Sequence, residues 1–299
     1  DLSLDIREGG AVLEHTFDHV DYISLHTYLN NYAGDSEGFL ASPDLMDAFI
    51  EEVVAIADAV AARRRSRKRI MLSFDEWNVW YRTRRRSADR VKPGWPVAPR
   101  ILEEVYTMED ALAFGGAVIS LLNHADRVKA ACLAQLVNAI APIMTEPGGP
   151  AWRQTIFHPF SDMSNFGRGR VLQVRVDSPT YSATYYDPRG SDDHRYPLAA
   201  VPYLKTAVVH DAQGGHLTIF ALNRHLGESM PLELVARGFQ GLRLEGGTQL
   251  RHVDLHAANT LEQQDRVRPA ALHVVDVAGD RVKAELAPAS WNVIRLRAG

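Results

Sequence analysis

The sequence lacks the features that mark several large classes of protein. Its 299 residues contain one cysteine, Cys132, so the chain cannot form an internal disulfide and is not a disulfide-stapled secreted domain. Apolar stretches such as residues 111–123 fall short of the about 18 residues that a membrane-spanning helix needs, and Gly115 and Gly116 interrupt this one. No internal repeat or low-complexity segment occurs. The composition is that of one large or two ordinary globular domains.

An excess of charge of one sign is also missing. The chain has 33 Lys and Arg against 37 Asp and Glu, a net charge of -4. This balance gives no electrostatic case for binding nucleic acid or an acidic membrane surface. The basic run at residues 63–69 is interpreted as the solvated C-terminal end of a helix, where cations are favoured. The run Arg82–Arg86 is interpreted as exposed charge in a loop. Cys132 lies in an apolar run, where a small buried thiol is expected.

Up to about residue 168, short β-type runs alternate with longer helical ones, which is the order of parallel βα units. Ser42 is interpreted as the N-cap of a helix that has Pro43 at its first position. The predicted strands are residues 22–26, 70–74 and 131–137. The predicted helices are residues 12–19, a segment from 43 to the basic run at 63–68, residues 108–122 and residues 151–160.

After about residue 170 the pattern changes to short alternating strands that are separated by Gly, Pro, Asp or Asn. This spacing is typical of an antiparallel β-sandwich. The predicted strands are residues 171–176, 216–222, 232–236, 272–277 and 292–296. The sequence therefore predicts an α/β part over residues 1–168 and an all-β sandwich domain over residues 169–299.

Polar and aromatic side chains follow the three predicted parallel strands, at the carboxyl ends where βα folds carry their chemistry. Residues two apart on a strand share a face, so His26 and Tyr28 should lie together. Asp75 directly precedes Glu76, and is therefore expected to point to the opposite side and to make a structural hydrogen bond. The side chains at the strand ends are His26 and Tyr28, then Glu76 with Trp77 and Trp80, then Gln135 and Asn138.

A carboxylate beside indole and phenol rings suits sugar chemistry. Aromatic rings cover the apolar C–H faces of a sugar, and amides and imidazoles bind its hydroxyls. The carboxylate can attack or stabilise the developing oxocarbenium centre. A single glutamate at a strand end is usually solvated or salt-bridged, but three polar strand ends in order favour a functional site.

The segment at residues 72–81, LSFDEWNVWY, closely resembles the nucleophile strand of the family 51 glycoside hydrolases, the α-L-arabinofuranosidases. Other blocks of this family are similar to residues 21–28, 124–129, 134–143, 152–155 and 290–294. The resemblance thus covers nearly the whole chain. It implies the C-terminal part of a (β/α)8 barrel, strands six to eight, followed by an antiparallel β-sandwich.

The resemblance also implies roles for five residues in the removal of terminal α-L-arabinofuranosyl groups with retention of configuration. Glu76 would be the nucleophile, Tyr28 would hydrogen-bond it, and His26 would help to orient it. Gln135 would hold the hydroxyls of the sugar, and Trp80 would wall the pocket. No metal or organic cofactor is implied. Arabinan, arabinoxylan and their oligosaccharides are the expected substrates.

One part of the family pattern is missing. The family's general acid/base is a glutamate that follows asparagine on the fourth strand, and no Asn-Glu dipeptide occurs in the 299 residues. A complete barrel takes about 250 residues, so we expect the C-terminal part of a longer enzyme. Because retaining hydrolysis needs two carboxyl groups, we expect this chain alone to be inactive. By the resemblance, the full-length enzyme should form a homo-oligomer, and the low cysteine content is compatible with the cytoplasm.

Two alternatives stay open. The first is a retaining glycosidase of the same barrel class with pyranose specificity. The second is a non-catalytic fragment that binds carbohydrate, which the missing acid/base would permit. Hydrolysis of a panel of substrates by the full-length enzyme would separate the first alternative from an arabinofuranosidase. Binding of arabino-oligosaccharides that is unchanged in a Glu76→Gln variant would indicate the second.

Overall fold

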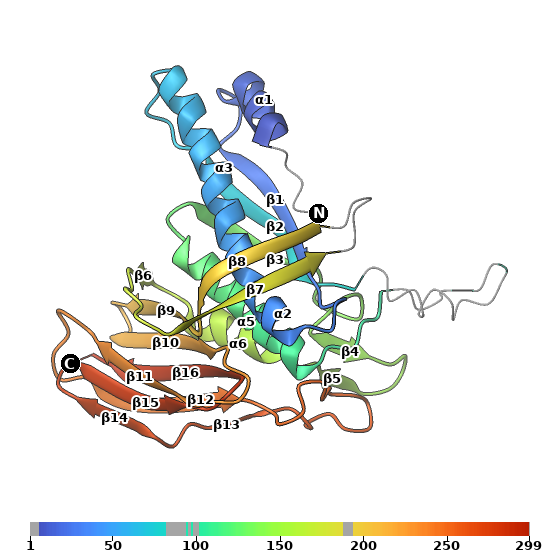
Figure 1. Ribbon diagram of the computed structural model, residues 1–299, viewed down its shortest axis with the longest axis vertical. Coiled ribbons are helices and arrows are strands. Elements are labelled where there is room, and N and C mark those ends of the chain that lie inside the picture. Colours follow the sequence, from blue (N-terminus) through green and yellow to red (C-terminus); the bar gives the residue numbers. More distant parts are fainter. Residues whose placement is uncertain (1–5, 82–93, 95–96, 98–101, 188–193, 299) are drawn as a thin grey trace.

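The computed structural model describes residues 6–81, 94, 97, 102–187 and 194–298, so the Arg82–Arg86 run lies outside the described residues. In this part of the chain a small parallel sheet with its helices is followed by antiparallel sheets (Figure 1). None of the described helices combines the length and the apolar character of a membrane-spanning segment. The helices are α1 (Ile6–Thr16), α2 (Ser36–Ala41), α3 (Pro43–Arg63), α5 (Met108–Asn123) and α6 (Phe157–Phe166).

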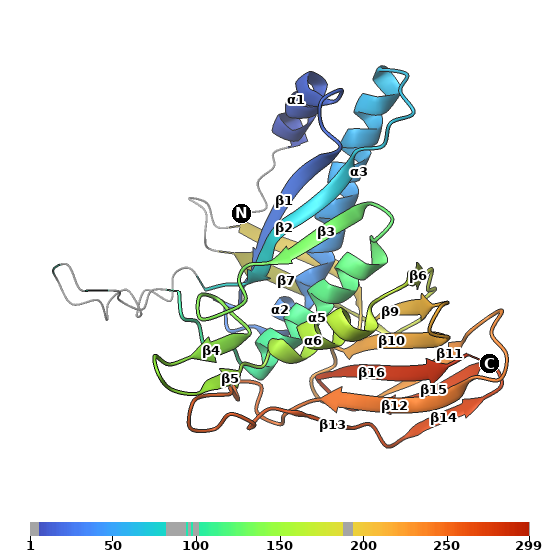
Figure 2. The ribbon, with the colours of Figure 1, turned by 180° about the vertical axis from the view of Figure 1, so that it is seen from behind.

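The parallel sheet contains β1 (Tyr22–Leu29), β2 (Met71–Val79) and β3 (Val128–Leu133), in the order β1-β2-β3. Helix α3 connects β1 to β2 and α5 connects β2 to β3, so each crossover is helical as parallel strands require. The helices cover one face of the sheet (Figure 2), while side chains on the other face of β1 are exposed at every second position up to His26. Within the described residues the sheet does not close into a barrel.

The antiparallel part packs a six-stranded sheet, in the order β13-β12-β16-β10-β9-β6, against a three-stranded sheet, β11-β15-β14. Leu217, Ile219, Leu232, Val282 and Ile294 belong to the buried cluster between them. The prediction of an antiparallel sandwich is therefore confirmed. The strands are β6 (Arg170–Leu172), β9 (Leu204–Asp211), β10 (His216–Asn223), β11 (Met230–Val235), β12 (Arg243–Leu250), β13 (Pro269–Ala271), β14 (Val275–Ala278), β15 (Arg281–Leu286) and β16 (Ser290–Arg297).

Helix α5 lies between the parallel sheet and the six-stranded sheet (Figure 2), and each of its residues from Met108 to Leu122 is buried. On one side the ring of Phe114 lies 4.7 Å from that of Trp77 in β2. On the other, Gly115 lets Trp291 of β16 approach closely, since a Cβ at position 115 would lie 2.6 Å from the indole ring. The central strands β9, β10 and β16 are consequently buried on both faces over most of their length, and a single core cluster contains residues of both parts.

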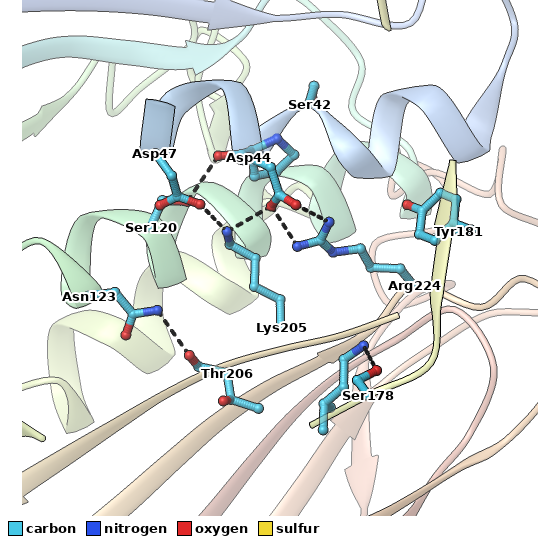
Figure 3. A network of polar contacts seen from close by, with 12 residues as sticks. Ser42, Asp44, Asp47, Ser120, Asn123, Ser178, Tyr181, Lys205, Thr206 and Arg224 are labelled. Carbon is cyan, nitrogen blue, oxygen red and sulfur yellow. Dashed lines mark hydrogen bonds and ion pairs between the residues drawn. The ribbon is translucent and has the colours of Figure 1, made fainter. Parts of the chain in front are cut away.

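Two buried cations meet two partly buried carboxylates where α3 contacts the sandwich (Figure 3). Arg224 follows β10 and donates to both carboxylate oxygens of Asp44, at 3.0 and 2.7 Å. Lys205 of β9 bonds Asp44 at 2.9 Å and also bonds Asp47. The Arg224 side chain is 1% exposed and that of Lys205 is 10% exposed. The two aspartates and the two cations thus neutralise one another at the interface between α3 and the sandwich.

A hairpin of β7 (Thr180–Asp187) and β8 (His194–Pro202) stands apart from the sandwich sheets. It lies beside α2 and the end of β1 (Figure 1), where the hydroxyl of Tyr185 accepts a hydrogen bond from the backbone N–H of Asn30 at 3.0 Å. The hairpin follows residue 168 in sequence, yet it packs on the first part of the chain. The division into residues 1–168 and 169–299 stays a prediction.

Several predicted element boundaries are wrong. The helix predicted at residues 12–19 is Ile6–Thr16, the strand predicted at 171–176 ends at Leu172, and the strand predicted at 272–277 starts at Val275. The third parallel strand is Val128–Leu133 and ends before Gln135, because pairing with β2 begins at Val128 and stops at Leu133. The helix predicted at residues 151–160 starts only at Phe157, because Ala151–Arg153 form strand β5 paired with β4 (Ile143–Thr145).

Two predicted side-chain environments are also wrong. Ser42 precedes α3, but its backbone is already helical, and its hydroxyl donates to the Phe39 carbonyl instead of capping. Helix α2 runs almost directly into α3, which leaves no extended residue to act as a cap. Cys132 is exposed, because β3 is an edge strand of the parallel sheet.

Candidate active site

Strand β2 contains a β-bulge at the position of its two adjacent carboxylates. Ser24 and His26 of β1 are separated by one residue, whereas their partners Ser73 and Glu76 are separated by two. A bulge sets two consecutive residues opposite one, which breaks the alternation of side chains. Asp75 and Glu76 therefore both lie on the exposed face, with side chains 43% and 41% exposed.

The expectation that Asp75 points away from Glu76 is wrong for this reason. The structural hydrogen bond expected of Asp75 is present, since the hydroxyl of Ser24 donates to Asp75 Oδ1 at 2.6 Å. Both carboxylates also approach the same imidazole ring, that of His26.

Each oxygen of the Glu76 carboxylate has a polar neighbour. The hydroxyl of Tyr28 donates to Oε1, and Nδ1 of His26 lies 3.5 Å from Oε2. Tyr28 is 8% exposed, and its ring meets that of Trp80 edge-on at 4.8 Å between centroids. The carboxylate is thus held at the exposed face of the sheet, beside an aromatic pair at the strand ends.

The ring of His26 stands between the two carboxylates. Its Nε2 lies 3.2 Å from Ser24 Oγ and 3.6 Å from Asp75 Oδ1, while its Nδ1 faces Glu76. The His26 side chain is half exposed. The polar contacts therefore form one row along the open face of the sheet. In order toward the carboxyl end of β1, the row consists of Ser24, Asp75, His26, Glu76 and Tyr28.

The loop after β3 is fastened by a buried amide. Asn78 of β2 is 2% exposed and donates to the carbonyls of Ala134 and Ile140, both at 2.6 Å. Gln135 lies in this loop, and its side chain is exposed. Among the described residues no hydrogen bond joins the Gln135 side chain to the other predicted site residues. The structure brings together His26, Tyr28, Glu76 and Trp80, and it places Gln135 at the end of the neighbouring strand.

The segment after β1 is fastened by the buried carboxyl of Glu109, near the start of α5. Ser36 donates to this carboxyl at 2.7 Å, and the amide of Asn31 donates to both oxygens at 3.3 and 3.2 Å. Burial raises the pKa of Glu109, and the hydrogen bond from Ser36 opposes the rise. The segment that follows Tyr28 is in this way hydrogen-bonded to α5.

Sequence reasoning missed Ser24 and Asn78 and placed the side chain of Asp75 on the wrong side of the strand. Ser24 could have been found, because it alternates with His26 on an exposed face. The side on which Asp75 lies could not, because the bulge that turns it depends on pairing with both neighbouring strands. Asn78 gave no signal beyond its place in the motif at residues 72–81.

The geometry permits a limited set of reactions. A half-exposed carboxylate held by a phenol and an imidazole can act as a nucleophile or as a general base. No group of three or more His, Cys, Asp or Glu side chains suited to a metal ion occurs in the part of the chain that the structure describes.

Comparison with known proteins gives consistent results. The model of the alpha-L-arabinofuranosidase C-terminal domain matches residues 75–290. An intracellular exo-alpha-(1->5)-L-arabinofuranosidase of Halalkalibacterium halodurans is 50% identical over 288 residues, which cover 96% of this chain and 54% of that protein. One of Streptomyces lividans is 49% identical over 285 residues, which cover 95% of this chain and 41% of that protein.

A solved structure supports the same relationship. The structure of a family 51 alpha-L-arabinofuranosidase from Bifidobacterium longum matches with a TM-score of 0.84 at 32% identity, over 98% of this chain and 56% of that one. The chain spans about half the length of the relatives it matches. It belongs to the alpha-L-arabinofuranosidases of glycoside hydrolase family 51 and corresponds to their C-terminal part.

Proposed function

We propose that the whole protein is a retaining α-L-arabinofuranosidase with Glu76 as its nucleophile. Its substrates would be polysaccharides and oligosaccharides that carry terminal α-L-arabinofuranosyl groups. The observation that carries the proposal is the Glu76 carboxylate at the open face, with Tyr28 on one oxygen and His26 beside the other. The names of the two relatives, both exo-arabinofuranosidases, support the substrate class.

The proposed reaction has two displacements. Glu76 attacks the anomeric carbon, a bond forms to its oxygen, and the bond to the glycosidic oxygen breaks. The leaving oxygen takes a proton from a second carboxyl group, which then serves as the base for an attacking water. Water cleaves the glycosyl ester and releases arabinose with its configuration retained. Tyr28 and His26 hold the carboxylate in line with the anomeric carbon throughout.

The second carboxyl must lie about 5 to 5.5 Å from the nucleophile, on the substrate side. Asp75 does not suit this role, because it lies on the Ser24 side of His26 and accepts a hydrogen bond from the Ser24 hydroxyl. We propose that the acid comes from outside these 299 residues, in which no Asn-Glu pair occurs. The chain alone should then be inactive.

Further roles follow the same scheme. Gln135 would bind hydroxyls of the sugar, since it is exposed at the end of β3. Trp80, packed on Tyr28, would wall the sugar site. The parallel unit over residues 1–168 would carry the chemistry, and residues 169–299 would form the sandwich domain. We also propose that the protein is intracellular, which the names of the relatives support. A homo-oligomeric state is proposed from the family resemblance alone.

The test compares the whole protein with its Glu76→Gln variant on 4-nitrophenyl α-L-arabinofuranoside. Loss of the nucleophile should lower kcat by about 10⁴-fold or more. Glu52→Gln, on the exposed side of α3, is a matched control that should keep full activity. Undiminished activity of Glu76→Gln would refute the proposal. Preferential cleavage of the corresponding pyranoside would favour the pyranose alternative, and binding of arabino-oligosaccharides without any hydrolysis would favour a binding module.

A further inference from the structure

We infer that Asp75 and Ser24 are positioning residues, which act through His26 to fix the orientation of the nucleophile. The inference rests on the proposed function of Glu76 and extends it to two residues that do not reach the reacting carboxylate. Their contact is with the opposite side of the imidazole, at Nε2.

The hydrogen bonds of Ser24 assign a hydrogen to one nitrogen of His26. The Ser24 hydroxyl has one hydrogen, and it donates this hydrogen to Asp75 Oδ1 at 2.6 Å. Toward Nε2 of His26, 3.2 Å away, the same oxygen can then only accept, so Nε2 must carry a hydrogen. This contact holds the ring with Nδ1 toward Glu76, and Nδ1 can donate to that carboxylate when it carries a hydrogen as well.

The bulge is what makes this arrangement available. Without it, Asp75 would alternate onto the face of the sheet that α3 and α5 cover. With it, His26 has a carboxylate on each side, at 3.6 Å and 3.5 Å. Both carboxylates are more than 40% exposed, so solvent screens their attraction to the ring. The orientation imposed through Ser24 is consequently the larger contribution of Asp75.

This support matters most when the nucleophile attacks. One carboxylate oxygen has to meet the anomeric carbon while the other keeps its contact, and a ring free to turn would let the carboxylate rotate. In metal sites, loss of the outer partner that orients a histidine lowers metal affinity or activity by about 10- to 100-fold, and we expect an effect of this size here. Because neither residue is placed against the sugar, we expect this loss in kcat with little change in KM.

The test is a double-mutant cycle in the whole protein with 4-nitrophenyl α-L-arabinofuranoside as the substrate. Asp75→Ala, which removes the oxygen that accepts the Ser24 hydrogen bond, should lower kcat about 10- to 100-fold. In a His26→Ala background the same substitution should have no further effect, because its action passes through the ring. Ser24→Ala should behave likewise, and it tests the inference if Asp75→Ala does not fold. Ser73→Ala, opposite Ser24 in the register, is the control that should keep its kcat.

Two results would overturn the inference. One is an unchanged kcat in both Asp75→Ala and Ser24→Ala. The other is losses at positions 75 and 26 that multiply, which would show independent roles. These outcomes are separate from failure of the proposed function, which is decided by Glu76→Gln alone. An inactive Glu76→Gln variant beside fully active Asp75→Ala and Ser24→Ala variants would remove this inference and leave the function in place.

Discussion

The charge cluster between α3 and the sandwich should be costly to break, and Asp44→Asn is the substitution that tests this. The change keeps the shape of the side chain but removes one of two anions (Figure 3). Arg224, which is 1% exposed, then keeps its charge without an ionised partner. A buried cation left in this way is far more costly than a pair lost from the surface.

The magnitude follows from the burial of each group. Removing one partner of a buried ion pair costs about 3–5 kcal/mol. Asp44 is 22% exposed, and Lys205 retains Asp47, so we expect the lower end, about 3 kcal/mol. Asp44→Asn combined with Arg224→Met removes both charges and should recover about 1–3 kcal/mol of that loss.

Equilibrium unfolding in urea measures these differences. The control is Glu233→Gln, which removes an exposed ion pair with Lys283. In this pair Nζ of Lys283 lies 3.0 Å from Oε1 of Glu233, and the side chains of Glu233 and Lys283 are 64% and 56% exposed. The control should cost about 0–1 kcal/mol. If Asp44→Asn cost no more than Glu233→Gln, or if the Arg224→Met substitution added to the loss instead of reducing it, the assignment of the cluster would be refuted.

Three further predictions concern pH and packing. Against the effect of burial, Lys205 lowers the pKa of Asp47 to about 2 from 3.8. Between pH 4 and pH 2 the unfolding free energy of the wild type should therefore fall by about 2 kcal/mol more than that of Asp47→Asn, as a urea series at each pH would measure. Burial raises the pKa of Asp162 to about 6, so the native state binds the proton more tightly and stability falls as pH rises from 3.8 to 6. Asp162→Asn should consequently raise the melting temperature at pH 8, and a decrease would contradict the assignment. Gly115→Ala should destabilise by about 1–3 kcal/mol through overpacking, while Gly227→Ala, with open space around its Cβ, should be nearly neutral in the same urea assay.

The sequence predicted the elements whose local pattern agrees with their final packing. Helix α5 was expected at residues 108–122 and is found at Met108–Asn123, started by a capping box between Thr107 and Asp110. The parallel strands, and the shared face of His26 and Tyr28, followed from alternation and from strand ends, whereas the contacts of these two residues with Glu76 followed from the family resemblance.

Other elements depend on contacts that no local pattern reveals. Strand β9 is buried on both faces through most of its length, so its residues do not alternate and it was not predicted. Ala151–Arg153 form a strand only because β4 pairs with them. The side of β2 on which Asp75 lies depends on a register shift against both β1 and β3. Tertiary pairing, rather than local preference, decided each of these.

The measurement that bears most directly on the central proposal is the identification of the attacking residue. The whole protein would be treated with an arabinofuranose-configured, mechanism-based electrophile that forms a stable ester with the nucleophile, then digested and examined by mass spectrometry. The account predicts a label on Glu76 and none in the Glu76→Gln variant. A label on any other residue of the wild-type protein would contradict it.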